Sequence, residues 1–158
     1  MIYSTVTVPV NAAGEPPLTW EQIWKGLVLK ARDARLFLPP GACTKCDVID
    51  EGEGYIVREA TILGEDLTEI ITFEPMTKVS FHQFKGPREG VIVNELREYE
   101  DGALQLQFYG LLGLKNVEPG GPEERQEQAM FDSEDRGYKA ALLTTLRRTR
   151  ALLQERKI

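Results

Sequence analysis

The chain has one histidine, His82, and two cysteines, Cys43 and Cys46, among its 158 residues. One histidine cannot supply the clustered nitrogen ligands of most metal centres. The alternation of side chains along its predicted strand places His82 on the outer face of the sheet, away from any catalytic triad. Glycine-rich segments fall at turns, and none matches a phosphate-binding loop or a dinucleotide fingerprint. We therefore expect no metal site and no cofactor.

Basic residues are in deficit, with 19 Lys and Arg against 25 Asp and Glu and a net charge of −6. This balance argues against nucleic-acid binding, because phosphate neutralisation needs a basic surface. No run of 18 apolar residues is present, so we expect no membrane span. The N-terminal segment MIYSTVTVPV lacks the regions of a signal peptide, which predicts a cytoplasmic protein in a reducing compartment.

The length favours a single domain over residues 1–158. Its first segment, residues 2–10, is rich in β-branched side chains and predicts a strand. Thr19 and Gln22 have the spacing of a helix-capping box, and apolar residues then recur every three or four positions. The prolines at 39 and 40 end this helical region.

From residue 43 onward, apolar residues recur at every second position instead of every three or four, as expected for strands with one buried face. The joints between these segments are short and contain Gly or Pro, so each neighbouring pair predicts an antiparallel hairpin. The result is a six-stranded meander, whose edge the first strand joins. Its predicted strands are 43–50, 54–63, 67–74, 77–84, 90–99 and 103–112.

The last third of the chain predicts one long helix, from Pro122 to about Leu153. Acidic residues dominate its first half and basic residues its second half, which complements the helix dipole. An antiparallel sheet with one polar face needs its other face covered, and this helix is the only element large enough.

This order of elements is similar to the helix-grip fold of the START/Bet v 1-like superfamily (SRPBCC). The segments LTWEQIWKGLVLKARDARLFLP, GYIVREATI, GVIVNELRE and GALQLQFYG more narrowly resemble its AtaL-like branch, over roughly residues 3 to 153. The resemblance implies an α+β fold: a seven-stranded antiparallel sheet wrapped around a long C-terminal helix, with two shorter helices after the first strand. It also implies a hydrophobic ligand cavity, sometimes used for catalysis. These motifs are structural patterns, so they indicate fold rather than activity.

Strand parity predicts which residues face that cavity. The turn YEDGA suits a three-residue hairpin loop, which pairs Leu96 with Leu106 and Asn94 with Phe108. These four side chains then lie on the interior face, where Asn94 is the polar exception. On the neighbouring hairpin, the same parity places Phe81 inside together with two polar residues, Glu69 and Gln83.

The strand at 54–63 allows two interior sets, one with Arg58 and Ala60 and the other with Val57 and Glu59. We favour the first, because Arg58 would then pair with Glu69 and a buried charge needs a partner. The predicted ligand-binding residues are Arg58, Glu69, Phe81, Gln83, Asn94, Leu106 and Phe108. The alternatives are a self-satisfied structural network and a register slip that turns every side chain to the other face.

The sequence therefore predicts the binding of a small or medium-sized hydrophobic molecule between the sheet and the C-terminal helix. Two other functions stay open. One is a cyclase, aromatase or isomerase that uses Glu69 as base, although an Arg58 partner would weaken a base there. The other is a protein-interaction module with a packed interior and no ligand. Monomer and homodimer are both compatible with the sequence.

The pair in GACTKCDV has the spacing of metal-binding and redox cysteines. Alternation along a strand would turn Cys43 and Cys46 to opposite faces, where they could not chelate one ion. A redox pair would sit at a helix N-terminus, whereas a strand follows here. We expect one of them to pack in the interior as a small apolar residue.

Overall fold

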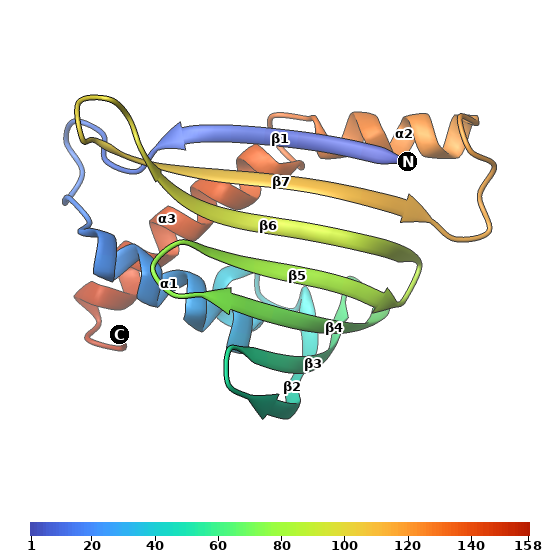
Figure 1. Cartoon of the computed structure of the whole chain (residues 1–158), viewed down its shortest axis with the longest axis horizontal. Helices are drawn as coiled ribbons and strands as arrows, with labels where there is room; N and C mark the ends of the chain where they lie inside the picture. Colours follow the sequence, from blue (N-terminus) through green and yellow to red (C-terminus); the bar gives the residue numbers. More distant parts are fainter.

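The computed structural model describes residues 1–158, and its strands form one antiparallel sheet in the order β1-β7-β6-β5-β4-β3-β2 (Figure 1). Six consecutive strands make a meander and β1 pairs with β7, which confirms the predicted topology. The strand bounds are β1 (Ile2–Pro9), β2 (Cys43–Gly52), β3 (Tyr55–Ile62), β4 (Glu65–Glu74), β5 (Lys78–Lys85), β6 (Arg88–Glu98) and β7 (Leu104–Leu114).

The predicted register of β6 and β7 is also confirmed. Asn94 lies opposite Phe108 and Leu96 opposite Leu106. The turn between these strands closes with a hydrogen bond of 2.9 Å from the Gly102 amide to the Tyr99 carbonyl. Gly102 adopts a φ of +83°, a left-handed conformation that glycine reaches without strain.

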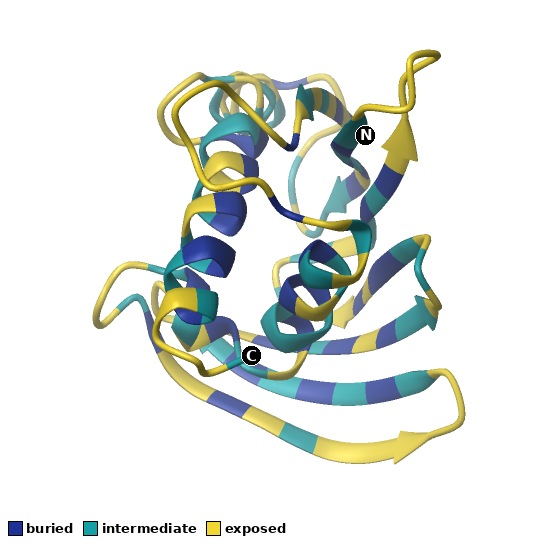
Figure 2. Ribbon diagram, turned by 90° about the vertical axis from the view of Figure 1, so that its left-hand side faces the viewer, coloured by how far each residue is buried: buried dark blue, intermediate teal, exposed yellow.

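Four helical segments accompany the sheet: α1 (Trp20–Arg32), the 3₁₀ helix η1 (Ala34–Phe37), α2 (Pro122–Phe131) and α3 (Tyr138–Gln154). The capping box forms as predicted, because Thr19 Oγ1 accepts from the Gln22 amide and the Gln22 side chain accepts from the Thr19 amide. The buried sides of α1 and α3 face the concave side of the sheet (Figure 2). No helix is both long and apolar enough to cross a membrane.

The prediction of one long C-terminal helix is wrong in its bounds, because the segment forms two helices. α2 ends at Phe131, and α3 begins only at Tyr138. Ser133 breaks the helix, since its hydroxyl donates to the Met130 carbonyl and accepts from the Arg136 amide. The 17 residues of α3 span about 26 Å, whereas one helix over the whole predicted segment would span about 45 Å.

The shorter α2 has a role that the sequence did not suggest, because it lies along the free edge of β1 (Figure 1). Gln128 Nε2 donates to the Tyr3 carbonyl at 2.7 Å, and Gln128 Oε1 accepts from the Tyr3 amide at 3.3 Å. Ser4 Oγ also donates to Asp132 Oδ1. Gln128 thus occupies backbone groups of Tyr3 that an edge strand otherwise leaves open, and Ser4 adds a side-chain contact.

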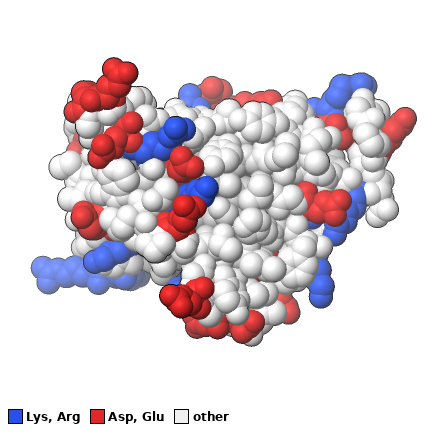
Figure 3. Space-filling model, in the orientation of Figure 1, with Lys and Arg blue, Asp and Glu red and all other residues white.

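The opposite, convex side of the sheet carries few charges over its central strands, and Lys, Arg, Asp and Glu gather around its border (Figure 3). His82 is exposed on this side, as parity predicted, and lies 3.3 Å from Thr72 Oγ1.

Candidate functional site

A cavity of about 190 Å³ lies on the concave side of the sheet, between η1, the end of α1 and the start of α3. Six of the seven residues predicted from the sequence line it; Leu106 is buried in the main core and does not line the cavity. The cavity wall consists of Lys30, Ala34, Phe37, Leu38, Arg58, Ile62, Leu67, Glu69, Phe81, Gln83, Ile92, Asn94, Phe108, Tyr138 and Ala141.

Arg58 and Glu69 form a buried ion pair at the cavity wall. They are direct neighbours across β3 and β4, with 2.5 Å between Arg58 Nη2 and Glu69 Oε1. Arg58 Nη1 also donates to the carbonyls of Lys30 and Ala31, so the guanidinium caps the end of α1. The structure therefore places the favoured set, with Arg58 and Ala60, inside.

Gln83 extends this pair by donating from Nε2 to Glu69 Oε2 at 3.4 Å. Both oxygens of the Glu69 carboxylate are thereby occupied by protein donors. A carboxylate held between a guanidinium and an amide is poorly placed to accept a proton from a ligand. This arrangement disfavours Glu69 as a catalytic base.

Lys30 is the cavity residue that sequence reasoning missed. It projects from the last turn of α1, and its Nζ donates to Asn94 Oδ1 at 3.1 Å. The same nitrogen lies 4.2 Å from the centre of the Phe108 ring, a favourable position for a cation. No carboxylate forms an ion pair with it, because Glu69 is already paired with Arg58.

Burial lowers the pKa of Lys30 to about 7, and the neighbouring Arg58 guanidinium adds to this decrease while Glu69 opposes it. The amine is thus neutral in a large fraction of molecules at physiological pH. A sequence signal for Lys30 did exist, since it follows Ile23 by seven residues and Leu27 by three. That spacing places it on the buried stripe of α1.

Three buried polar atoms at this cavity have no hydrogen-bond partner within the protein: Arg58 Nε, Gln83 Oε1 and Asn94 Nδ2. The amide orientations follow from their other contacts, because Lys30 requires an acceptor on Asn94 and the Glu69 carboxylate requires a donor on Gln83. An unpaired buried polar atom costs about 1–3 kcal/mol. The site therefore offers two donors and one acceptor to a bound molecule.

Tyr138, at the first turn of α3, forms another part of the cavity wall. Burial raises the pKa of its hydroxyl, so the group stays protonated at neutral pH. The hydroxyl lies against the backbone of Gly110 on β7, where a methyl group would overlap it. The absence of a side chain at Gly110 is what allows α3 to approach the sheet here.

The cysteines depart from the prediction, because both Cys43 and Cys46 are buried. A register shift between Cys43 and Lys45 breaks the alternation of β2, so both side chains point inward and pack with Ala34 and Ala60. Cys46 Sγ accepts from the Ala34 amide at 3.4 Å. Burial raises the pKa of Cys43, and the nearby Cys46 adds to the increase, which opposes a reactive thiolate.

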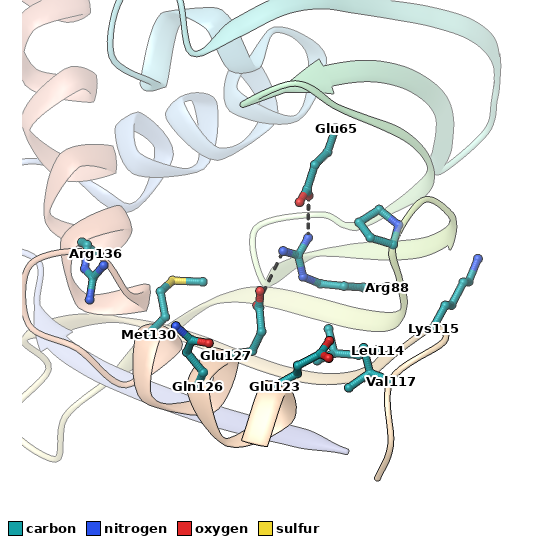
Figure 4. Close-up of a pocket in the computed structure, with 11 residues that line it drawn as sticks. Glu65, Arg88, Leu114, Lys115, Val117, Glu123, Gln126, Glu127, Met130 and Arg136 are labelled. Atoms are coloured by element: carbon teal, nitrogen blue, oxygen red, sulfur yellow. Dashed lines mark hydrogen bonds and ion pairs between the residues drawn. The ribbon is translucent and has the colours of Figure 1, made fainter. Parts of the chain in front are cut away.

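A larger hollow of about 480 Å³ lies at the other end of the sheet, beside α2 (Figure 4). Arg88 crosses it and pairs with Glu65 at 3.0 Å and with Glu127 at 3.6 Å. Most of its wall is polar, and its central cation is already matched by two carboxylates. The hollow thus lacks the apolar lining that favours a hydrophobic ligand.

Several solved structures share the fold over nearly the whole chain. The Zhui aromatase/cyclase from Streptomyces sp. R1128 has 17% sequence identity and a TM-score of 0.62, covering 99% of this chain and 94% of its own. TTHA0849 from Thermus thermophilus has 10% identity and a TM-score of 0.61, with coverages of 95% and 97%. Ara h 8.0201 has 12% identity and a TM-score of 0.58, with coverages of 97% and 99%.

Sequence identities this low show that the fold is shared and do not show a shared activity. No significant match is found among curated proteins. The family model described as "Acetylaranotin biosynthesis cluster protein L" matches residues 4–156, which is almost the entire sequence. The chain belongs to this AtaL family, within the SRPBCC/Bet v 1-like proteins.

Proposed function

We propose that this protein binds a small oxygenated ring compound in the cavity beside Lys30. The observation that carries the proposal is the group of three unpartnered polar atoms, on Arg58, Gln83 and Asn94, in an otherwise mainly apolar wall. A ligand with a carbonyl or phenolic oxygen would accept from the two donors, and a hydroxyl would donate to Gln83 Oε1.

The cavity volume limits the size of the ligand. Drug-sized ligands occupy pockets of about 300–1,000 Å³, whereas benzene fits an apolar cavity of about 150 Å³. The cavity volume of about 190 Å³ suits a molecule of one ring or of two compact rings. This is the small end of the range expected from the sequence.

Electrostatics favours an electron-rich oxygen on that ligand. The cavity wall carries two basic side chains, Lys30 and Arg58, and one carboxylate, that of Glu69. With Lys30 protonated the wall has a net positive charge, and with Lys30 neutral it is balanced. A phenolate, enolate or carboxylate oxygen would therefore be bound most strongly when Lys30 holds its proton.

The test compares 2-hydroxybenzyl alcohol with toluene, which has a similar ring and no oxygen, by NMR titration of the amide resonances around the cavity. We expect the alcohol to bind more tightly. The variant Asn94→Leu keeps the size of the side chain and should reduce that preference about tenfold, since one buried hydrogen bond is lost.

The matched control is His82→Ala, which changes an exposed residue on the convex side and should leave both affinities unchanged. Binding of neither compound would contradict the proposal. So would an unchanged preference for the alcohol in Asn94→Leu. Thermal unfolding of each variant separates a lost ligand contact from a lost fold.

A cyclase-type enzyme remains the second candidate, and one observation favours it: the Lys30 amine, with a pKa of about 7, is suited to proton transfer near neutral pH. The candidate base would then be Lys30 on α1 rather than Glu69, whose two oxygens are occupied. Loss of turnover in Lys30→Met, with retained turnover in Glu69→Gln, would support this assignment.

A further inference from the structure

Lys30 is an unusual cation because nothing negative is paired with it. Every acceptor it meets is neutral: the Asn94 amide oxygen at 3.1 Å and the face of Phe108 at 4.2 Å. Several exposed lysines of this chain have carboxylate partners, as Lys45 has in Glu59 at 2.9 Å. An amine in an apolar cavity beside another cation is the arrangement in which lysine becomes a nucleophile.

We propose that Lys30 captures an aldehyde or ketone ligand covalently, as an imine on its Nζ. This inference rests on the proposed function, because the carbonyl compound must first enter the same cavity. It also narrows the ligand class from oxygenated rings in general to rings that carry a reactive carbonyl group.

Asn94 gives the geometry for this reaction. Its Oδ1 accepts from the Lys30 amine, and its Nδ2 is a buried donor without a partner. Both atoms belong to one planar amide, so a carbonyl oxygen that accepts from Nδ2 would hold its carbon next to the Lys30 nitrogen. The donor also polarises the carbonyl bond toward attack.

The chemistry is balanced without any further reagent. The lone pair of Nζ forms a bond to the carbonyl carbon while the C–O double bond opens, and a proton moves from nitrogen to oxygen. The remaining C–O bond then breaks, and the oxygen leaves as water with both hydrogens that the amine has lost. A C=N bond joins the ligand to Lys30, and nothing is oxidised or reduced.

The surroundings favour the free amine before the reaction and the cationic imine after it. Phe108 would stabilise a protonated, cationic imine as it does the ammonium group. The other charged or titratable groups lining the cavity are Arg58 on β3, Glu69 on β4 and Tyr138 on α3. Burial and Arg58 lower the pKa of Lys30 to about 7, so the free amine is available under physiological conditions.

The experiment uses 2-hydroxybenzaldehyde with sodium cyanoborohydride, which reduces an imine to a stable secondary amine. Intact mass and peptide mapping then locate the label. We expect labelling at Lys30 to exceed that at any exposed lysine by about tenfold or more at pH 7, because ordinary lysine amines are almost fully protonated there. Lys30→Met and Lys30→Arg should lose the label.

Lys25→Met is the matched control, since Lys25 is exposed on the same helix and should not affect the labelling of Lys30. Even labelling of surface lysines, with none preferred, would overturn the inference. Binding of 2-hydroxybenzyl alcohol without labelling of Lys30 by the aldehyde would overturn it as well, while leaving the proposed function intact. Binding of neither molecule would overturn both.

Discussion

Arg58 and Glu69 meet directly across β3 and β4, and their side chains are only 5% and 3% exposed. A charge pair this deep places two ions where solvation is poor, so each depends on the other. The pair also connects the sheet to α1, through the bonds of Arg58 to the carbonyls of Lys30 and Ala31. It therefore contributes to the structure of the cavity as well as to its polarity.

The first prediction concerns this pair. Arg58→Met and Glu69→Leu should each lower the free energy of unfolding by about 3–5 kcal/mol, because each leaves one charge buried and unpaired. The double variant should recover much of the loss, since neither charge then remains. Denaturant unfolding of the four proteins gives the coupling energy.

An exposed pair on the neighbouring strands serves as the control. Lys45 and Glu59 lie 2.9 Å apart but are 47% and 41% exposed. Lys45→Met should cost less than about 1 kcal/mol. If Arg58→Met were no more destabilising than Lys45→Met, the buried pair would not have the structural role described.

The second prediction is a pH dependence from Lys30. Its pKa in the folded protein is about 7, below the ordinary value of 10.5, so the unfolded chain binds more protons between these two values. Stability should then rise as pH increases from about 7 toward 10.5, with a slope of at most about 1.4 kcal/mol per pH unit. Below about pH 7 the penalty for the buried charge is fully present.

Unfolding measured at pH 7, 8 and 9 tests this slope by comparison between variants. Lys30→Met should gain stability over the wild type, and the gain should be largest at pH 7 and shrink at pH 9. Lys25→Met should run parallel to the wild type throughout. A constant difference between Lys30→Met and the wild type would show that Lys30 titrates normally.

Most of the fold and the positions of several cavity side chains could be predicted because they depend on strand alternation. The turn at Gly102 sets the register of β6 and β7, and that register alone places Asn94 and Phe108 inside. The pairing of Arg58 with Glu69 follows from the same alternation and the cost of an unpaired buried charge. Only the placement of these side chains was tested; their binding roles stay predictions.

Two of the failures share a cause, since each involves a local departure from regular periodicity. The register shift after Cys43 turns both cysteines inward, and no sequence pattern marks it. The hydroxyl of Ser133 ends α2 inside a segment that looks helical throughout. Lys30 was missed because lysine usually extends to solvent, whereas here three-dimensional packing holds its amine over Phe108.

The third prediction follows from the burial of the cysteines. In the native protein, Cys43 and Cys46 should react with a thiol reagent such as DTNB at least about 100-fold more slowly than in the unfolded chain, since both are buried and burial also disfavours the thiolate of Cys43. Absorbance after mixing, with and without guanidinium chloride, measures the two rates. Rapid native reaction of either thiol would indicate that β2 opens at its first residues.

The fourth prediction concerns the edge of the sheet. Gln128 bonds to both the amide and the carbonyl of Tyr3, so it occupies the place of a neighbouring strand along β1. Gln128→Ala should lower the free energy of unfolding by about 0.5–1.5 kcal/mol, because these bonds are near solvent and water replaces them in part. It should also increase self-association, since exposed strand edges pair readily.

Gln126→Ala is the matched control, because Gln126 is exposed on the same helix and makes no hydrogen bond to β1. Denaturant unfolding and sedimentation velocity over a range of protein concentrations compare the two variants. If both behaved alike, the contact of Gln128 with Tyr3 would be incidental, and protection of the edge would have to come from the bulk of α2. A difference in self-association without one in stability would instead assign to Gln128 the role of blocking strand addition.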